Sequence, residues 1–322
     1  MNRIFRGAAA WVLASSAIAG WAQAWPSKPI RMIVPFPAGG PVDQTARTLG
    51  TKVGAALKQP VLIDNRGGAA GVLGADAVAK APADGYTLLF SSAGALSIVP
   101  NIAPSMPYNP QKDLQAVTLA VKVPTVLVVS AESKFRTLAE LLDAARANPG
   151  KINYASAGSG TTTHLEVELL KREAKVNMNH IPYRGAAPAL TDLMGGQVDL
   201  MMADVPVVLP FIKAGKMRAL AVTSLRRIPV LKDVLTTAEL GLPKVEVYNW
   251  YGLLAPARTP PEVVDRLYRE VSTALRAPEL KESFVQQGIE VVGSRPEEFG
   301  PYILAETARW GALARAVGAK LD

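Results

Sequence analysis

Short apolar runs alternate with amphipathic stretches along most of the chain, a pattern typical of parallel α/β sheets. The first run, residues 30–34, is suited to a buried strand that ends at Pro35, because proline has no amide hydrogen to donate. After the loop that holds Gly39 and Gly40, apolar residues recur on one helical stripe to about residue 58. This unit predicts a helix start with free N–H groups at the carboxyl edge of a sheet, where small anions bind.

The same unit recurs at residues 152–174, where the loop Ser-Ala-Gly-Ser-Gly-Thr-Thr precedes a second helix. Further short strands are predicted between helices, at residues 61–64, 87–90, 126–129, 180–183, 199–202, 219–222 and 250–255. Helices of the last third are each expected to open at a proline suited to a helix's first turn, at Pro260, Pro278 and Pro296. We therefore predict an α/β protein of two lobes, each a mostly parallel sheet flanked by helices, with a ligand cleft between them. The predicted boundaries are residues 25–122 plus 250–322 for the first lobe and 123–249 for the second.

The first 24 residues have the features of a cleavable secretory signal. Arg3 and Arg6 form a charged start, residues 8–19 are apolar, and a small-x-small site ends at Ala24. The apolar segment is too short to span a bilayer, and the chain has no cysteine that could carry a lipid anchor. We therefore expect export to the periplasm, cleavage between Ala24 and Trp25 or close by, and a freely diffusing mature protein.

The composition argues against several classes of function. The net charge is +8 at pH 7, but the basic residues are dispersed and Arg226–Arg227 is the only pair of arginines, so nucleic-acid binding is not expected. The absence of cysteine excludes disulfides, thiolate metal sites and cysteine nucleophiles. Because His164 and His180 are the only histidines, we also predict no metal site, no cofactor and no catalytic residue.

Polar residues after the first-lobe strands each have a ligand-binding and a structural interpretation. Asp43 could orient a polar ligand group, or it could stabilise the helix start and pair with Arg47. Ser91 and Ser92 could line the cleft or cap the next helix, and their place at the end of a strand favours the cleft.

Two residues of the second lobe have a similar pair of interpretations. Arg184 could bind a carboxylate with both arms of its guanidinium, or it could be an exposed turn residue before Gly185. Asp204 would repel a carboxylate but could accept hydrogen bonds from a ligand amine or from water. Its alternative role is to cap the helix that follows Pro206.

Seven motifs, taken in order, resemble those of a known family. They are Trp-Pro-Ser-Lys-Pro-Ile at residues 25–30, Val-Pro-Phe-Pro-Ala-Gly-Gly at 34–40, Asp-Asn-Arg-Gly-Gly-Ala at 64–69, Asp-Gly-Tyr-Thr-Leu-Leu at 84–89, Ser-Ala-Gly-Ser-Gly at 156–160, Pro-Tyr-Arg-Gly at 182–185 and Gly-Gly-Gln-Val-Asp-Leu-Met at 195–201. Each motif alone is a common loop pattern. Their order and spacing, over nearly all the mature chain, resemble the periplasmic solute-binding receptors of tripartite tricarboxylate transporters, also called the Bug family.

The resemblance implies a type II-like periplasmic binding protein, and not an enzyme, that closes on a small carboxylate such as a dicarboxylate, an acidic amino acid or an aromatic acid. Its partner would be a membrane permease with one large and one small subunit, and we expect the receptor to be a monomer. In the family, one loop from each lobe holds the ligand carboxylate. The matching residues are Phe36, Pro37, Ala38, Gly39 and Gly40 in the first lobe, and Ser156, Ala157, Gly158, Ser159, Gly160 and Thr161 in the second.

The chain departs from the family pattern after the first loop, where Pro41-Val42-Asp43 replaces a small residue, a Thr or Ser, and an Asp. Val42 has no hydroxyl and Pro41 has no amide hydrogen, so we expect the ligand to differ more than the fold. Two other functions remain open. One is a sensor that presents its closed form to a signalling partner, and the other is a periplasmic hydrolase, which would need a histidine near Ser156 or Ser159.

Overall fold

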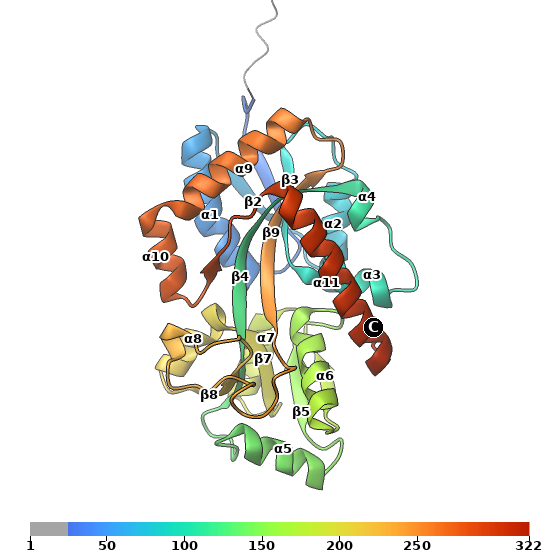
Figure 1. The fold of residues 1–322 in the computed structure, drawn as a ribbon, viewed down its shortest axis with the longest axis vertical. Coiled ribbons are helices and arrows are strands. Elements are labelled where there is room, and N and C mark those ends of the chain that lie inside the picture. The colour runs from blue at the N-terminus through green and yellow to red at the C-terminus, as the bar shows by residue number, and fades with distance from the viewer. Residues whose placement is uncertain (1–24, 322) are drawn as a thin grey trace, which may run out of the picture.

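One long strand, β4 (Leu114–Ser130), runs through both halves of the molecule, and two groups of strands pair with it (Figure 1). The computed structural model describes residues 25–321, and the predicted signal peptide lies outside them. Within this described range, no helix is long and apolar enough to cross a membrane.

The first lobe is built on the upper group of strands. Besides the first part of β4, these are β1 (Ile30–Val34), β2 (Val61–Asn65), β3 (Thr87–Ser91), β9 (Tyr248–Pro256) and β10 (Glu290–Val291). Strand β1 is parallel to β2 and β3, whereas β9 is antiparallel to β3 and β4.

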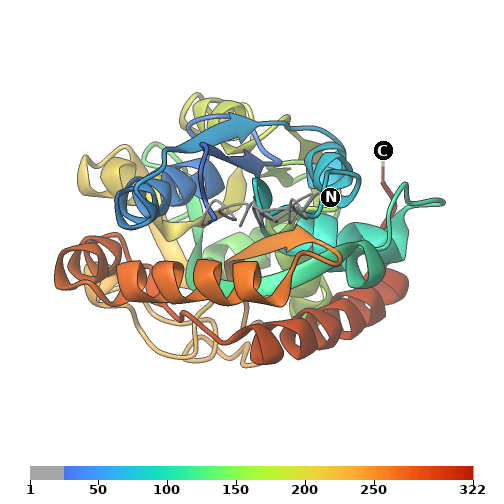
Figure 2. The ribbon, with the colours of Figure 1, turned by 90° about the horizontal axis from the view of Figure 1, so that it is seen from above.

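Helices cover both faces of this upper sheet. One core lies under α1 (Pro41–Leu57), α9 (Pro261–Arg276) and α10 (Pro278–Gln286). The other lies under α2 (Val72–Ala79), α3 (Val99–Ile102) and α11 (Pro296–Val317), and the short α4 (Pro110–Asp113) leads into β4. Seen from above, α9 and α11 lie along one side of the molecule (Figure 2).

The second lobe repeats this layered arrangement on the lower part of β4. Its strands are β5 (Asn153–Ser156), β6 (Asn179–Pro182), β7 (Leu200–Asp204) and β8 (Met217–Val222). Its helices are α5 (Leu138–Ala147), α6 (Thr162–Ala174), α7 (Ala186–Met194) and α8 (Val205–Lys213), which cover two further apolar cores. Strand β5 is parallel to β6 and β7, and the whole sheet has the order β2-β1-β3-β9-β4-β7-β5-β6.

Strand β4 changes partners where the two lobes meet. Up to Pro124 it pairs with β9, from Thr125 it pairs with β7, and from Val126 it also pairs with β8. Strand β9 begins at Tyr248, opposite Pro124. This crossing supports the predicted lobe boundaries, near residues 122 and 249, which stay a prediction.

The predicted two-lobed α/β fold is confirmed, and β4 is the main local difference. The pattern predicts a strand only at residues 126–129, whereas β4 begins at Leu114. Polar residues at Gln115, Thr118 and Lys122 interrupt the apolar run, and two register shifts interrupt its pairing with β9. The apolar periodicity therefore does not predict the full length of the strand that passes from one lobe to the other.

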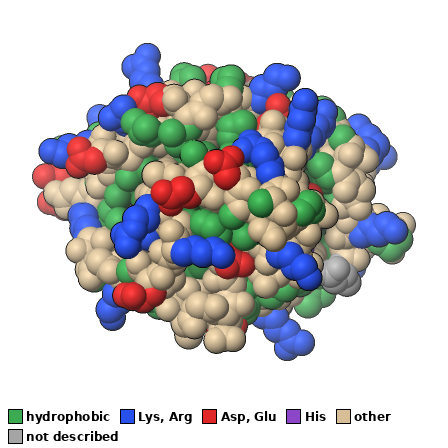
Figure 3. Space-filling view, turned by 90° about the horizontal axis from the view of Figure 1, so that it is seen from below, with side chains coloured by type: hydrophobic (Ala, Val, Ile, Leu, Met, Phe, Trp, Pro, Cys, Tyr) green, Lys and Arg blue, Asp and Glu red, His purple; other side chains and the backbone are tan. Residues whose placement is uncertain are grey.

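Charged side chains of both signs are mixed on the lower end of the molecule. Viewed from below, Lys and Arg side chains are spread over the surface with Asp and Glu between them (Figure 3). The positive net charge is thus distributed on this face instead of being gathered in one field.

The contact between α11 and β9 gives a test of the packing in the first lobe. A Cβ atom added at Gly252 of β9 would overlap the ring of Phe299, which is fully buried on α11. We therefore expect Gly252→Ala to lower the free energy of unfolding by about 1–3 kcal/mol, measured by denaturant titration. The matched control is Gly300→Ala, next to Phe299 but with open space around its Cβ, which should be neutral or stabilising. Equal stabilities of the two variants would contradict the packing.

Candidate functional site

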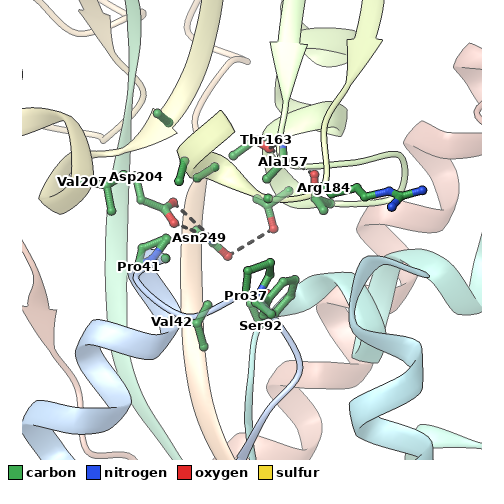
Figure 4. Close-up of a pocket in the computed structure, with 18 of the residues that line it drawn as sticks. Pro37, Pro41, Val42, Ser92, Ala157, Thr163, Arg184, Asp204, Val207 and Asn249 are labelled. Atoms are coloured by element: carbon green, nitrogen blue, oxygen red, sulfur yellow. Dashed lines mark hydrogen bonds between the residues drawn. The ribbon is translucent and has the colours of Figure 1, made fainter. Parts of the chain in front are cut away.

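A cavity lies between the lobes, where both strand–loop–helix units end (Figure 4). Its volume is about 70 Å³. The first residues of α1, α6 and α7 line it, and so does Asp204, immediately before α8. The first N–H groups of a helix lack partners within the helix and carry partial positive charge, so four helix starts around one cavity favour an anion.

The predicted ligand-binding residues divide between the cavity wall and the structure behind it. Nine of them line the cavity: Phe36, Pro37, Ala38, Gly40, Ser92, Ala157, Thr161, Arg184 and Asp204. The other predicted residues do not belong to this wall: Gly39, Asp43, Ser91, Ser156, Gly158, Ser159 and Gly160.

Asp43 holds the first loop and the start of α1 together. Its Oδ2 accepts hydrogen bonds from the backbone N–H of Gly39 at 2.9 Å and from Arg47 Nε at 3.0 Å, and its Oδ1 accepts one from Asn65 Nδ2 at 2.9 Å. Burial raises the pKa of Asp43, but these hydrogen bonds and the Arg47 charge outweigh it, so the pKa is lowered overall. These contacts agree with the structural role considered for Asp43, in which it stabilises the start of α1 and pairs with Arg47.

The first glycine loop uses its amides internally. The N–H of Gly39 donates to Asp43, and that of Gly40 donates to the carbonyl of Pro37 at 3.4 Å. Gly39 has φ +80°, which favours glycine, whereas Gly40 has φ −74°, which any residue adopts. The backbone freedom expected at both glycines is therefore needed only at Gly39.

The second glycine loop is held in the same way. The N–H of Gly158 donates to Ser156 Oγ at 3.1 Å, and that of Gly160 donates to His164 Nδ1 at 3.3 Å. The donors that face a ligand at this wall are therefore those of the helix starts, such as the first turn of α6, which begins at Thr162.

Asn249, at the start of β9, connects three elements in the cavity wall. Its Nδ2 donates to both carboxylate oxygens of Asp204, at 3.1 and 3.2 Å, and its Oδ1 accepts from the Thr162 hydroxyl at 3.1 Å. Asn249 was not predicted from the sequence, because it lies outside the glycine loops and its only signal is a polar side chain within an apolar strand. The other lining residues that were not predicted are Pro41, Val42, Thr162, Thr163, Gly185, Ala186, Ala187, Pro188, Met201, Ala203 and Val207.

Asp204 is almost fully buried at the end of β7. Burial raises its pKa to about 6, although hydrogen bonds from Tyr251 and Asn249 oppose the shift. The Tyr251 hydroxyl donates to Oδ2 at 2.5 Å. Asp204 makes no capping bond with its side chain to α8, so the capping interpretation is wrong.

Glu166, on α6, is a second buried acid near Asp204. It is fully buried, and neither of its carboxylate oxygens makes a hydrogen bond of ordinary geometry within the described residues. Burial and the charge of Asp204 raise the pKa of Glu166 well above its usual range, and Thr125 and Arg309 oppose this only in part. Burial thus disfavours the charged form of Glu166 in the folded receptor.

Arg184 and the two serines differ in how they meet the cavity. Arg184 is exposed, and its guanidinium extends away from the cavity (Figure 4). Ser92 lines the wall, as its place at the end of a strand suggested, whereas Ser91 is fully buried and its hydroxyl donates to the Ser92 carbonyl at 3.5 Å. Neither serine caps the helix that follows.

Ser156, at the end of β5, and His180, on β6, form a contact that resembles a hydrolase pair. Ser156 Oγ lies 2.7 Å from His180 Nε2, and the His180 ring stacks on His164 with 4.0 Å between centroids. However, Ser156 is fully buried and does not line the cavity. A nucleophile must reach its substrate, so this pair is suited to bracing the loop.

The two lobes touch beside the cavity. Gly185 of the second lobe has φ +112°, and a Cβ atom there would lie 3.1 Å from Cγ of Pro37 in the first lobe. Gly160 packs against Val99 and Leu321, and α11 of the first lobe lies beside α6 (Figure 1). The two lobes are therefore in direct contact beside the cavity.

A sequence profile of the tripartite tricarboxylate transporter family receptor matches residues 45–319. The chain belongs to this family. The receptor is 45% identical over 313 residues to the UPF0065 protein in the tcbD-tcbE intergenic region of Pseudomonas sp. strain P51, a match that covers 97% of this chain and 93% of that protein.

Solved structures agree with this assignment. The receptor superposes on the periplasmic binding protein BugD with a TM-score of 0.88 and 36% identity, over 92% of this chain and all of that one (100%). It superposes on R. palustris Rpa4515 with adipate with a TM-score of 0.89 and 34% identity, over 92% of this chain and 100% of that one. The resemblance to the Bug family is confirmed, and the receptor is a two-lobed solute-binding protein.

The buried Glu166 predicts a characteristic dependence of stability on pH. The folded receptor keeps the Glu166 proton to a higher pH than the unfolded chain, whose glutamates titrate near about 4.3. As the pH rises above that value, the unfolded state alone releases this proton, so Glu166 lowers stability increasingly. Glu166→Gln removes this titration, and its thermal midpoint relative to the wild type should therefore rise from pH 4.5 to pH 8.

The control for this comparison is Glu262→Gln, on the exposed side of α9. Its midpoint relative to the wild type should stay nearly constant over the same pH range. A constant difference for Glu166→Gln as well would show that Glu166 is not held in its protonated form.

Proposed function

We propose that this receptor, exported to the periplasm, captures a small carboxylate between its lobes and delivers it to a membrane permease with one large and one small subunit. The observation that carries the proposal is the convergence of helix starts from both lobes on one cavity. Membership of the receptor family supports it, and so does the relative Rpa4515, whose structure holds adipate.

The proposed carboxylate position lies at the start of α6. Ala157 and Thr163 line that end of the cavity (Figure 4), and the N–H of Ala157 donates to the Thr163 hydroxyl at 3.0 Å, which holds the loop against the helix. The first-turn N–H groups of α6 can then meet the carboxylate oxygens. Asp204 lies toward the other end, where it would accept hydrogen bonds from a water molecule or from a ligand N–H or O–H group.

Ala38 offers a direct test of anion binding, because it lines the cavity and is exposed. Ala38→Asp places a negative charge beside the ligand, and at an effective dielectric constant of about 20 two charges 4 Å apart interact by about 4 kcal/mol. We expect this variant to bind carboxylates at least about tenfold more weakly in isothermal titration of the mature protein. Ala38→Asn, which has the same size without the charge, should lose much less.

The binding panel should contain mono-, di- and tricarboxylates and acidic amino acids. An absence of binding across the whole panel would refute the carboxylate, and equal affinities of Ala38→Asp and Ala38→Asn would refute its position. Delivery is tested separately by uptake of the bound acid in a deletion strain. Unchanged uptake would argue for a sensor.

A further inference from the structure

A second cavity adjoins the first at the cleft's edge. It has a volume of about 250 Å³, and the two cavities share Gly40, Ala186, Ala187 and Val207 in their walls. We call this second cavity the annex. For comparison, an apolar cavity of about 150 Å³ takes a benzene molecule.

The annex runs along the flanks of two helices. Ala187, Leu190, Thr191 and Met194 recur at the spacing of one face of α7, and Phe211 follows Val207 by four residues on α8. The inner cavity meets the first residues of these helices, whereas the annex follows their sides toward their carboxyl ends. The attraction of the helix starts for anions therefore weakens along the annex, because it falls off within the first turn.

The annex wall has no charged side chain among the residues described. Its apolar surface comes mainly from Leu190, Met194, Val207 and Phe211, and methionine adapts its shape to different apolar partners. Of its two polar side chains, the Thr191 hydroxyl donates to the Ala187 carbonyl at 3.2 Å, and Gln44 Nε2 donates to the Gly39 carbonyl at 2.9 Å. These donors bond within their own elements.

The inner cavity also opposes a second negative charge on the ligand. Asp204 lies at the same end as Val207 and Pro41, away from Ala157 and Thr163 (Figure 4). Arg184 is the only basic residue that lines either cavity in the described chain, and its guanidinium extends away from the cavity. A second carboxylate on the ligand would thus lie beside the acid Asp204 and apolar side chains.

Resting on the proposed function, we infer that the ligand is a monocarboxylate with an apolar tail, whose carboxylate binds in the inner cavity and whose alkyl or aryl tail fills the annex. The annex is lined by Gly39, Gly40 and Gln44 from the first lobe and by α7 and α8 from the second. The tail therefore contacts both lobes, and its burial favours the closed form.

The matched probes are hexanoate and adipate, which have six carbon atoms each and differ at one end. Isothermal titration of the mature wild-type protein should show hexanoate binding at least tenfold more tightly than adipate. Affinity should also rise about fourfold for each methylene group from butyrate to hexanoate, as expected when each becomes buried. Equal or tighter binding of adipate would overturn the inference.

A charge placed in the annex should reverse this preference. Met194 is half-buried there, and Met194→Arg supplies a partner for a second carboxylate, so the ratio of adipate to hexanoate affinity should rise at least tenfold. Leu304→Arg adds the same charge at an exposed position on α11 outside both cavities, and its ratio should match the wild type. An unchanged ratio in a folded Met194→Arg variant, checked by its thermal midpoint, would overturn the assignment of the annex.

The results separate this inference from the function on which it rests. Tight binding of dicarboxylates with weak binding of monocarboxylates would refute the apolar tail and keep the carboxylate receptor. Failure of every carboxylate to bind would refute both.

Discussion

The arrangement of the cleft depends on how one buried carboxylate is held where the two lobes meet. Asp204 ends β7 in the second lobe and is almost fully buried, and a charge in such a place is tolerated only when donors surround it. Tyr251 and Asn249 supply these donors from β9, which pairs with the first-lobe strands. The cavity wall of one lobe is thereby tied to a strand of the other, beside the crossing of β4. Movement of the lobes must leave this junction in place or break hydrogen bonds to a buried charge.

The same junction sets the charge of the site. Asn249 uses both ends of its amide, toward Asp204 and toward Thr162 at the start of α6, so its orientation and the position of that helix are coupled. Glu166 lies one helical turn further along α6 and has no comparable donors, so burial raises its pKa well above the usual range. Burial raises the pKa of both acids, of Asp204 to about 6 and of Glu166 well above its usual range, so the charged form of each is less favoured than in an exposed acid. An anionic ligand is opposed by the acidic side chain of Asp204 on this side and attracted by the helix starts around it.

Local signals were enough to predict the two-lobed fold and the two loops that form the cleft. The run that ends at Pro35 and the positive φ at Gly39 follow from the residues themselves, and so does the glycine loop before α6. The roles of Asn249 and Glu166 depend on residues far away in the sequence, so no spacing or motif could have revealed them. Both loops lie between a strand and a helix, where the sequence places them, and their role in ligand binding stays a prediction. The hydrogen bonds of their amides could not be predicted, because partners such as Asp43 become visible only in three dimensions.

Backbone groups that attract an anion and side chains that discriminate between ligands are separate in this fold, so the same fold can bind different ligands. Glycine amides that bond within their own loops give two rigid turns, and these turns position helix starts whose attraction for an anion does not depend on side chains. Selectivity then falls to the few side chains between the helix starts. Pro41 and Val42, where the chain departs from the family pattern, both line the cavity, and neither supports the fold through a polar contact of its side chain. Val42 also packs in the first-lobe core, so a substitution there must keep that packing if it is to change the ligand without disturbing the turns that attract it.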